Sequence, residues 1–123
     1  MKLNYKFGNE WLNKLKDFWA NKDIAGATSL FIKTEYYQET PFMKPYTTFE
    51  EIQKEWQHIE NQDINKIEFT ILAIDNNTMI VEWFFERDIT VFDGIYQIKF
   101  NDDLECIYFK SWEMEQETKQ ELV

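Results

Sequence analysis

The stretch VEWFFERDITVFDG, Val81–Gly94, decides the fold because it offers two positions at which a β-hairpin can turn. Asp93-Gly94 between alternating residues is a strong hairpin signal. A turn there would pair a strand of about 14 residues with one of about six, whereas strands typically have about five or six residues. A turn at Arg87-Asp88 pairs strands of similar length. We favour Arg87-Asp88 and keep Asp93-Gly94 as the alternative.

The turn position determines which side chains share a face of the sheet. A turn at Arg87-Asp88 pairs Trp83 with Phe92, and a second turn at Asp102-Asp103 then pairs Tyr96 with Phe109. We expect the resulting apolar face to point inward, with Met79, Val81, Trp83, Phe85, Phe92, Gly94, Tyr96, Ile98, Phe100, Ile107, Phe109, Ser111 and Glu113. The Asp-Gly turn would instead point Arg87 inward and place Phe92 at the rim.

The opposite face of these strands carries Ile80, Phe84, Val91 and Ile95. Such an apolar cluster is more than a monomer usually exposes. A two-fold homodimer is the simplest way to cover it.

Helical spacing dominates the first half of the chain. Asn9 or Gly8 can cap a first helix, and Asp23 can cap a second, short helix that ends near Thr28. The first helix has one apolar stripe, formed by Trp11, Leu12, Leu15, Phe18 and Trp19. Thr, Tyr, Ile and Phe in residues 30–38 favour a strand.

A third helix begins at a capping box, in which Thr48 and Glu51 satisfy each other's free amides. Its buried stripe consists of Phe49, Ile52, Trp56 and Ile59. Residues 66–74 then alternate as a half-buried strand whose inner positions are Ile67, Phe69, Ile71 and Ala73, and Asp75-Asn76-Asn77 turns the chain. Two or three strands follow to about Glu113, and the polar tail EQETKQELV is expected to fray.

Helices followed by an antiparallel meander predict an α+β domain, with three helices from the N-terminal half covering one face of a curved sheet. At 123 residues we expect one domain over residues 1–123, with a core at about residues 9–114.

Composition limits the function classes. Asp and Glu number 23 against 13 Lys and Arg, so nucleic acid and anionic membranes would be repelled. The start lacks signal-peptide features and there is no run of 18 apolar residues, so we expect a cytoplasmic protein. Cys106 is the one cysteine and cannot form an internal disulfide. Aromatic residues make up 18% of the chain, either as core or as pocket wall.

Three stretches resemble the nuclear transport factor 2-like superfamily and, more narrowly, its SnoaL-like branch. They are FWANKDIAGATSLF, TPFMKPYTTFEEIQKEW and GIYQIKFNDDLECIYFKSWE, and together they span roughly residues 10–114. The chain departs from the family pattern at Thr48 and Leu104, where relatives have glycine, at Tyr96 in place of Trp, and at Ser111 in place of Glu. The resemblance implies a cone-shaped fold, also called cystatin-like, in which a strongly bent sheet wraps around a cavity. Proteins with this fold often dimerise through the convex face of the sheet.

Two inward residues are candidates for proton transfer. Glu113 would lie beside Phe92 and Trp83, where desolvation raises a carboxyl pKa, unless it reaches solvent at the strand end. Tyr96 occupies the position at which the resembled ketosteroid isomerases have a proton-donating Asp, and it can donate to a ligand oxygen or to a backbone carbonyl. The expected ligand-binding residues are Trp19, Trp83, Phe85, Phe92, Tyr96, Phe109 and Ser111.

The other catalytic roles of the resembled families are missing. Leu15 and Thr40 stand at the isomerase Tyr and Asp positions, with Glu39 beside Thr40, and Ile89 takes the second position of the epoxide hydrolase Arg/Asp set. His58, the single histidine, cannot build a histidine-based metal site and is expected at the surface. Cys106 is expected to be an inert thiol. We expect neither metal nor cofactor.

Two hypotheses follow. The first is a small-molecule-binding cone domain that takes an apolar or aromatic ligand, with activity as a cofactor-independent isomerase, lyase or hydrolase left open. The second is a noncatalytic, dimeric interaction domain with a filled core. An interior void below about 100 Å³ would exclude the first, because drug-sized ligands need several hundred Å³.

Overall fold

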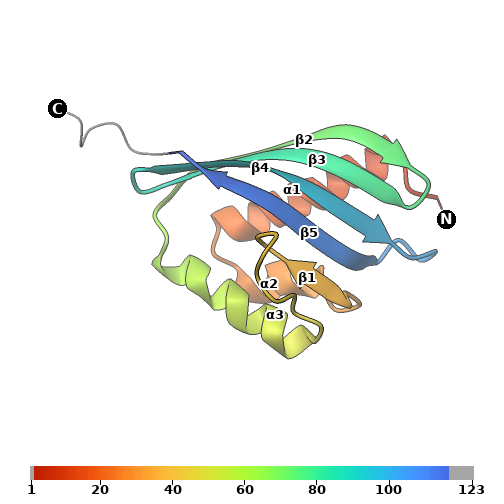
Figure 1. The fold of residues 1–123 in the computed structure, drawn as a ribbon, viewed down its shortest axis with the longest axis horizontal. Helices are drawn as coiled ribbons and strands as arrows, with labels where there is room; N and C mark the ends of the chain where they lie inside the picture. The colour runs from red at the N-terminus through yellow and green to blue at the C-terminus, as the bar shows by residue number, and fades with distance from the viewer. Residues whose placement is uncertain (1, 117–123) are drawn as a thin grey trace.

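The computed structural model describes residues 2–116 and shows an α+β fold. Three α-helices and a short 3-10 helix accompany a five-stranded sheet (Figure 1). The elements in chain order are α1 (Tyr5–Ala20), α2 (Ile24–Ser29), β1 (Tyr36–Gln38), α3 (Phe49–Trp56), η1 (Gln57–Asn61), β2 (Ile64–Asp75), β3 (Thr78–Arg87), β4 (Thr90–Phe100) and β5 (Cys106–Glu115). Residues 117–123, most of the tail expected to fray, lie outside this description.

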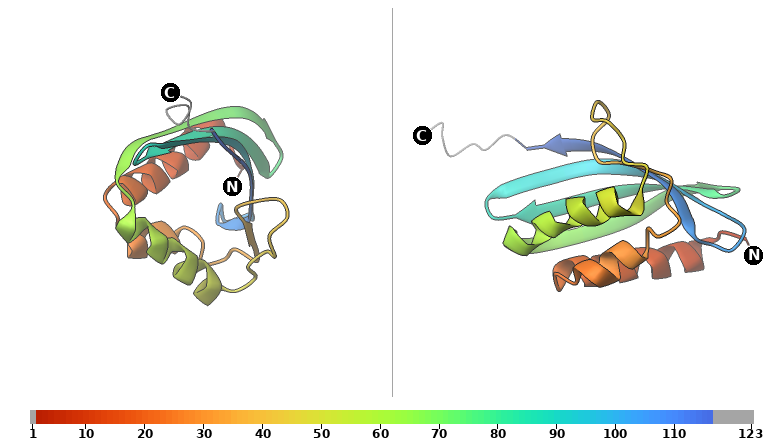
Figure 2. Two further views of the ribbon diagram at one scale, coloured as in Figure 1. Left: turned by 60° about the vertical axis from the view of Figure 1, so that its left-hand side comes forward. Right: turned by 90° about the horizontal axis from the view of Figure 1, so that it is seen from below.

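The sheet has the strand order β1-β5-β4-β3-β2. The four long strands form the expected antiparallel meander, whereas β1 joins the edge parallel to β5 and makes the sheet mixed. The sheet curves strongly, and the helices face its concave side (Figure 2). Within residues 2–116, no helix is long and apolar enough to cross a membrane.

The first helix begins earlier than the sequence predicted. Asn4, rather than Gly8 or Asn9, is the N-cap, and its side chain accepts a hydrogen bond from Phe7 N at 2.8 Å. Gly8 serves helix packing instead, because a Cβ there would lie 2.9 Å from Ile71 Cδ1 and 3.0 Å from Met79 Sδ. The missing side chain therefore lets α1 lie close to the sheet.

The caps of the other two helices are confirmed. Asp23 accepts from Gly26 N at the start of α2, and the Thr48–Glu51 capping box starts α3. The strand expected over residues 30–38 is wrong for most of its length, since only Tyr36–Gln38 pairs with β5. Phe31 instead turns into the core and is fully buried, so its burial outweighs the local β-propensity.

The decisive hairpin turns at Asp88-Ile89, one residue after the favoured position. Arg87 pairs with Thr90, and Asp88 takes a positive φ of 53°, which Asp tolerates better than most residues. The predicted pairing of Trp83 with Phe92 is therefore wrong, because Trp83 faces Gly94. A shift of the turn by one residue moves every partner by two, so the two faces remain as predicted.

The β4–β5 connection shows the same displacement. Tyr96 faces Ser111 rather than Phe109. A register shift between Lys99 and Phe100 buries Cys106 and leaves Ile107 half-buried, against the expected inner face. In β2, a register shift between Ile71 and Ala73 exposes Ala73, which was expected inside.

The interior is filled at one end by aromatic residues. Trp11 meets Phe31 and Phe100 edge to face, with ring centroids 5.8 Å and 5.5 Å apart. Phe31 also meets Phe109 at 5.2 Å. Rings in these arrangements leave little space. A cavity of about 470 Å³ lies toward the other end, near Trp19, Trp83 and Phe92, whereas the pocket beside Phe100 has about 240 Å³.

Candidate functional site

A cavity of about 470 Å³ lies between the concave face of the sheet, the C-terminal end of α1 and the α3–η1 segment. All the predicted site residues line it. The lining consists of Trp19, Tyr37, Glu39, Glu55, Trp56, His58, Ile59, Asn61, Gln62, Trp83, Phe85, Arg87, Phe92, Tyr96, Phe109, Ser111 and Glu113. The void is several times larger than the limit of about 100 Å³ for a filled core.

The aromatic wall is held in place by ring contacts and one buried hydrogen bond. Trp83 stacks on Tyr96 at 5.3 Å, and its Nε1 donates to Ser111 Oγ at 3.1 Å. Gly94 makes room for this indole, because a Cβ there would lie 2.7 Å from Trp83 Nε1. On the helical side, Trp19 lies 4.4 Å from Phe85 and donates to Gln62 Oε1 at 3.3 Å.

Two polar groups in this wall have no partner. The Tyr96 side chain is buried, yet its hydroxyl makes no hydrogen bond among the described residues. Of the two expected roles of this hydroxyl, donation to a backbone carbonyl is therefore not found among these residues. The buried indole Nε1 of Trp56 also has no hydrogen-bond partner there. Buried polar groups are normally paired. The unpaired hydroxyl of Tyr96 is therefore available to a bound molecule.

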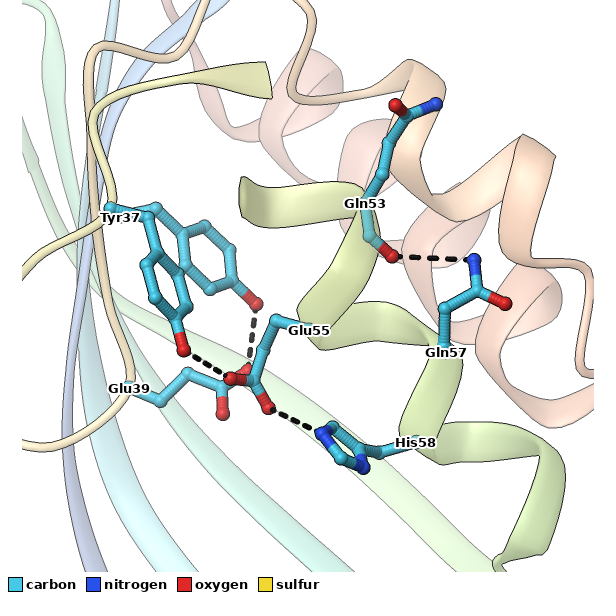
Figure 3. A network of polar contacts seen from close by, with 7 residues as sticks. Tyr37, Glu39, Gln53, Glu55, Gln57 and His58 are labelled. Carbon is cyan, nitrogen blue, oxygen red and sulfur yellow. Dashed lines mark hydrogen bonds and ion pairs between the residues drawn. The ribbon is translucent and has the colours of Figure 1, made fainter. Parts of the chain in front are cut away.

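A pair of carboxyl groups lies on one side of the cavity. Tyr37 Oη donates to Glu39 Oε2 at 2.8 Å, and Tyr46 Oη donates to Glu55 Oε1 at 2.6 Å. His58 Nε2 lies 3.8 Å from Glu55 Oε2 (Figure 3). Glu39 follows β1 two positions after Tyr37 and therefore points to the same side, whereas Glu55 comes from α3.

Glu39 has the most perturbed carboxyl group in the cavity. Burial, together with the nearby carboxylate of Glu55, raises its pKa to about 7, although the hydrogen bond from Tyr37 opposes the rise. Burial also raises the pKa of Tyr37 and that of Tyr96 well above the usual value, and Glu39 adds to both shifts. Glu39 can therefore hold or release a proton near neutral pH.

The mouth of the cavity carries both signs of charge. Glu113 is exposed, and its pKa is raised by partial burial and by Glu115 but lowered by Arg87. Arg87 contacts Asp88 at 3.3 Å, and its guanidinium lies 5.1 Å from the ring centroid of Phe92. Because the hairpin turns at Asp88-Ile89, Arg87 is the last residue of β3 and lies on its inner face. The Asp-Gly alternative predicted this inward direction of Arg87.

The remaining sequence predictions are mixed in outcome. His58 is at the surface, with 74% of its side chain exposed, but it also lines the cavity. Cys106 is an inert thiol, because burial raises its pKa to about 12. Sequence reasoning missed Glu55 and mentioned Glu39 only as a neighbour of Thr40. In the described part of the chain, no group of three or more His, Cys, Asp and Glu side chains could hold a metal ion.

Comparison with known proteins supports the fold. No protein-family model and no curated protein sequence matches the chain. Among solved structures, an NTF2-like protein of unknown function from Burkholderia xenovorans LB400 matches with a TM-score of 0.72 and 12% identity, over 94% of this chain and 91% of that chain. The epoxide hydrolase/cyclase-like enzyme SalBIII of salinomycin pyran ring formation matches with a TM-score of 0.77 and 8% identity, over 90% and 93%.

A steroid delta-isomerase from Pseudomonas aeruginosa matches with a TM-score of 0.65 and 17% identity, over 86% of this chain and 78% of that chain. A SnoaL-like structure is also among those matched. At such low identities the likeness concerns the fold. The chain has the nuclear transport factor 2-like fold.

Proposed function

We propose that this protein binds a small, largely apolar or aromatic molecule in the cavity of its cone. The observation that carries the proposal is a void of about 470 Å³ walled by aromatic rings, with the hydroxyl of Tyr96 in its lining and without a hydrogen-bond partner among the described residues. Pockets for small molecules have this combination of apolar walls and few polar groups. Structural neighbours named as an isomerase and as an epoxide hydrolase/cyclase-like enzyme agree with it.

Proton transfer is the chemistry that this cavity can supply by itself. Tyr96 can donate a proton or a hydrogen bond, and Glu113 remains the acid or base proposed from the sequence. Glu39 joins them, because its pKa of about 7 lets it exchange a proton at neutral pH. Isomerase, lyase and hydrolase reactions without a cofactor all need such groups.

A thermal-shift screen of small aromatic compounds tests the binding proposal. We expect hits that raise the melting temperature of the wild type and bind Tyr96→Phe about three- to tenfold more weakly, the range for one lost hydrogen bond of roughly 0.5–1.5 kcal/mol. Glu113→Gln is measured in parallel. Tyr5→Phe is the matched control, since Tyr5 is exposed on α1 and away from the cavity.

The absence of any hit would contradict the proposal. Equal binding by Tyr96→Phe and the wild type would remove this hydroxyl from the site. For any hit, loss of a carbon-bound proton signal in deuterated water, measured by NMR, would show proton transfer. Retention of that signal at all pH values from 6 to 8 would leave binding without catalysis.

A further inference from the structure

The charges that line the cavity are mostly negative. Glu39, Glu55 and Glu113 contribute carboxyl groups, and Arg87 is the guanidinium among the lining residues of the described chain. The other ionisable base in the lining is His58, whose side chain is largely exposed. The cavity therefore presents an acidic interior to whatever enters it.

The Glu39–Glu55 pair has hydroxyl partners but no Lys or Arg partner within residues 2–116. Tyr37 and Tyr46 each supply one neutral hydrogen bond to the pair. An ionised carboxylate in the interior costs free energy unless a cation pairs with it. The protein alone provides at most the imidazole of His58, at 3.8 Å from Glu55. Below a pKa of about 7 a proton neutralises Glu39, and above it a cationic ligand can pair with these carboxyl groups.

Aromatic rings stand beside the acidic pair. Trp19 and Trp56 meet edge to face at 5.4 Å, and both line the same cavity as Glu39 and Glu55. The faces of Trp and Tyr rings attract ammonium groups, most strongly where water is excluded. A cavity lined by both aromatic rings and carboxyl groups suits an organic cation with an apolar body better than a hydrated metal ion.

Tyr96 gives an independent observation at this site. The Tyr96 side chain is 5% exposed, its hydroxyl has no partner in the described structure, and Glu39 and Glu113 both act on its pKa. This hydroxyl can accept a hydrogen bond from a ligand as well as donate one. It lies in the wall of the cavity and close enough to Glu39 to feel its charge.

An anionic ligand is the opposite possibility, because Arg87 lies at the mouth. That guanidinium already contacts Asp88 and lies over Phe92. An anion drawn inward from Arg87 would meet Glu39 and Glu55. The arrangement disfavours a deeply bound anion.

We propose that the cavity takes an organic cation, an ammonium group carried on an apolar or aromatic body, with the ammonium group beside Glu39 and Glu55. This inference rests on the proposed binding function and names its ligand class. The aromatic body lies against Trp83, Phe85 and Phe92, and the polar end of the ligand faces Tyr96.

The affinity for such a cation increases with pH. A cation favours ionised Glu39, so affinity rises as pH increases through about 7, the pKa of this group in the free protein. The groups that face Glu39 are Tyr37, Glu55 on α3, Tyr96 on β4 and Glu113 on β5. His58 lies next to Glu55, with Nε2 at 3.8 Å from Glu55 Oε2.

Two probes of the same shape separate charge from hydrophobicity. They are (3-hydroxymethylphenyl)trimethylammonium and (3-tert-butylphenyl)methanol, which differ in one quaternary nitrogen in place of carbon, and neither probe titrates between pH 6 and 8. We expect calorimetry at pH 8 to give at least tenfold tighter binding of the cation. We also expect this preference to shrink severalfold at pH 6, while the affinity of the neutral alcohol stays constant.

Variants identify the groups that hold the cation. Glu39→Gln and Glu55→Gln are each expected to reduce the preference for the cation at least fivefold, and Glu39→Gln also to weaken its pH dependence. Glu10→Gln is the control, because Glu10 is exposed on α1 and lies outside the cavity lining, yet the substitution changes net charge equally. If one variant does not fold, the other variant and the wild-type pH series still decide the matter.

The outcomes separate this inference from the function on which it rests. Binding of (3-tert-butylphenyl)methanol as tightly as the cation, or an unchanged preference in both Glu variants, overturns the cation inference and leaves the binding function standing. Binding of neither probe overturns the cation inference as well, and a wider screen without hits then contradicts the binding function itself.

Discussion

At the scale of single residues, Glu39 couples the site to the stability of the fold. Its pKa is about 7 in the folded protein against 4.5 for an unperturbed glutamate. Between these values the folded state holds a proton that the unfolded chain has lost, so stability falls as pH rises from about 4.5 to about 7 and is then constant. The full shift corresponds to roughly 3 kcal/mol at most.

We therefore predict that Glu39→Gln stabilises the protein at high pH. Gln keeps an acceptor for the Tyr37 hydroxyl but cannot ionise. Urea unfolding should give equal free energies for variant and wild type near pH 4.5, and an advantage of about 1–3 kcal/mol for the variant at pH 8. Glu10→Gln, at an exposed position on α1, serves as control. A difference between Glu39→Gln and wild type that does not change with pH would contradict the assigned titration.

The sequence could predict the aromatic wall of the site but not its acidic pair. Trp83, Phe85 and Tyr96 alternate on strands, and this pattern alone fixes their side. Glu39 follows a three-residue strand in a Pro-containing loop, and Glu55 lies on a helix beside Trp56. No local pattern brings these two carboxyl groups together, because their proximity depends on how α3 packs over β1.

At the scale of elements, the residue that follows the end of α1 has a backbone conformation that glycine would adopt at lower cost. Lys22 has a positive φ of 56° and closes a Schellman motif, in which Lys22 N donates to Trp19 O and Asp23 N donates to Phe18 O. The left-handed conformation costs non-glycine residues about 1–2 kcal/mol, and glycine loses part of this gain through its greater unfolded entropy.

We predict that Lys22→Gly raises the free energy of unfolding by roughly 0.5–1 kcal/mol, measured by urea denaturation. The loss of the exposed hydrogen bond from Lys22 Nζ to Glu60 O, at 3.3 Å, should offset little of this gain. The same substitution at Lys16, an exposed residue within α1, should instead destabilise by about 1 kcal/mol. Destabilisation by both substitutions would show that Lys22 is not strained.

The hairpins show why sequence fixes faces better than registers. In both hairpins the observed strand partners lie two residues away from the predicted ones. Trp83 and Tyr96 therefore point inward as predicted, although their partners differ. Alternation has a period of two and cannot distinguish registers that differ by two. The register shifts at Ile71/Ala73 and Lys99/Phe100 leave no clear sequence signal, and they account for the errors at Ala73 and Ile107.

At the scale of the whole molecule, the aromatic excess serves two purposes. Near Trp11, Phe31 and Phe100 it fills the cone, and near Trp19 and Trp83 it lines the cavity. The sequence could not distinguish packed rings from lining rings, because both alternate inward. The difference arises where α3 and η1 stand away from the sheet.

The outer face of the sheet carries the last prediction, a two-fold homodimer through Ile80, Phe84, Val91 and Ile95. These side chains are half-buried in the single chain, and Met114, opposite Asp93 on β5, is 73% exposed. Ile95 lies on β4 between Glu82 and Trp112, so a second copy would bury it near the middle of the contact.

Sedimentation of the wild type at tens of micromolar should therefore give twice the 15.1 kDa mass of one chain. Ile95→Lys should give the monomer, because a lysine at the centre of an apolar contact would be desolvated without a partner. Ile32→Lys is the matched control, since Ile32 is 57% exposed outside the sheet, and it should remain dimeric. A 15.1 kDa wild type at this concentration would defeat the prediction, and a dimeric Ile95→Lys variant would place the interface elsewhere on the molecule.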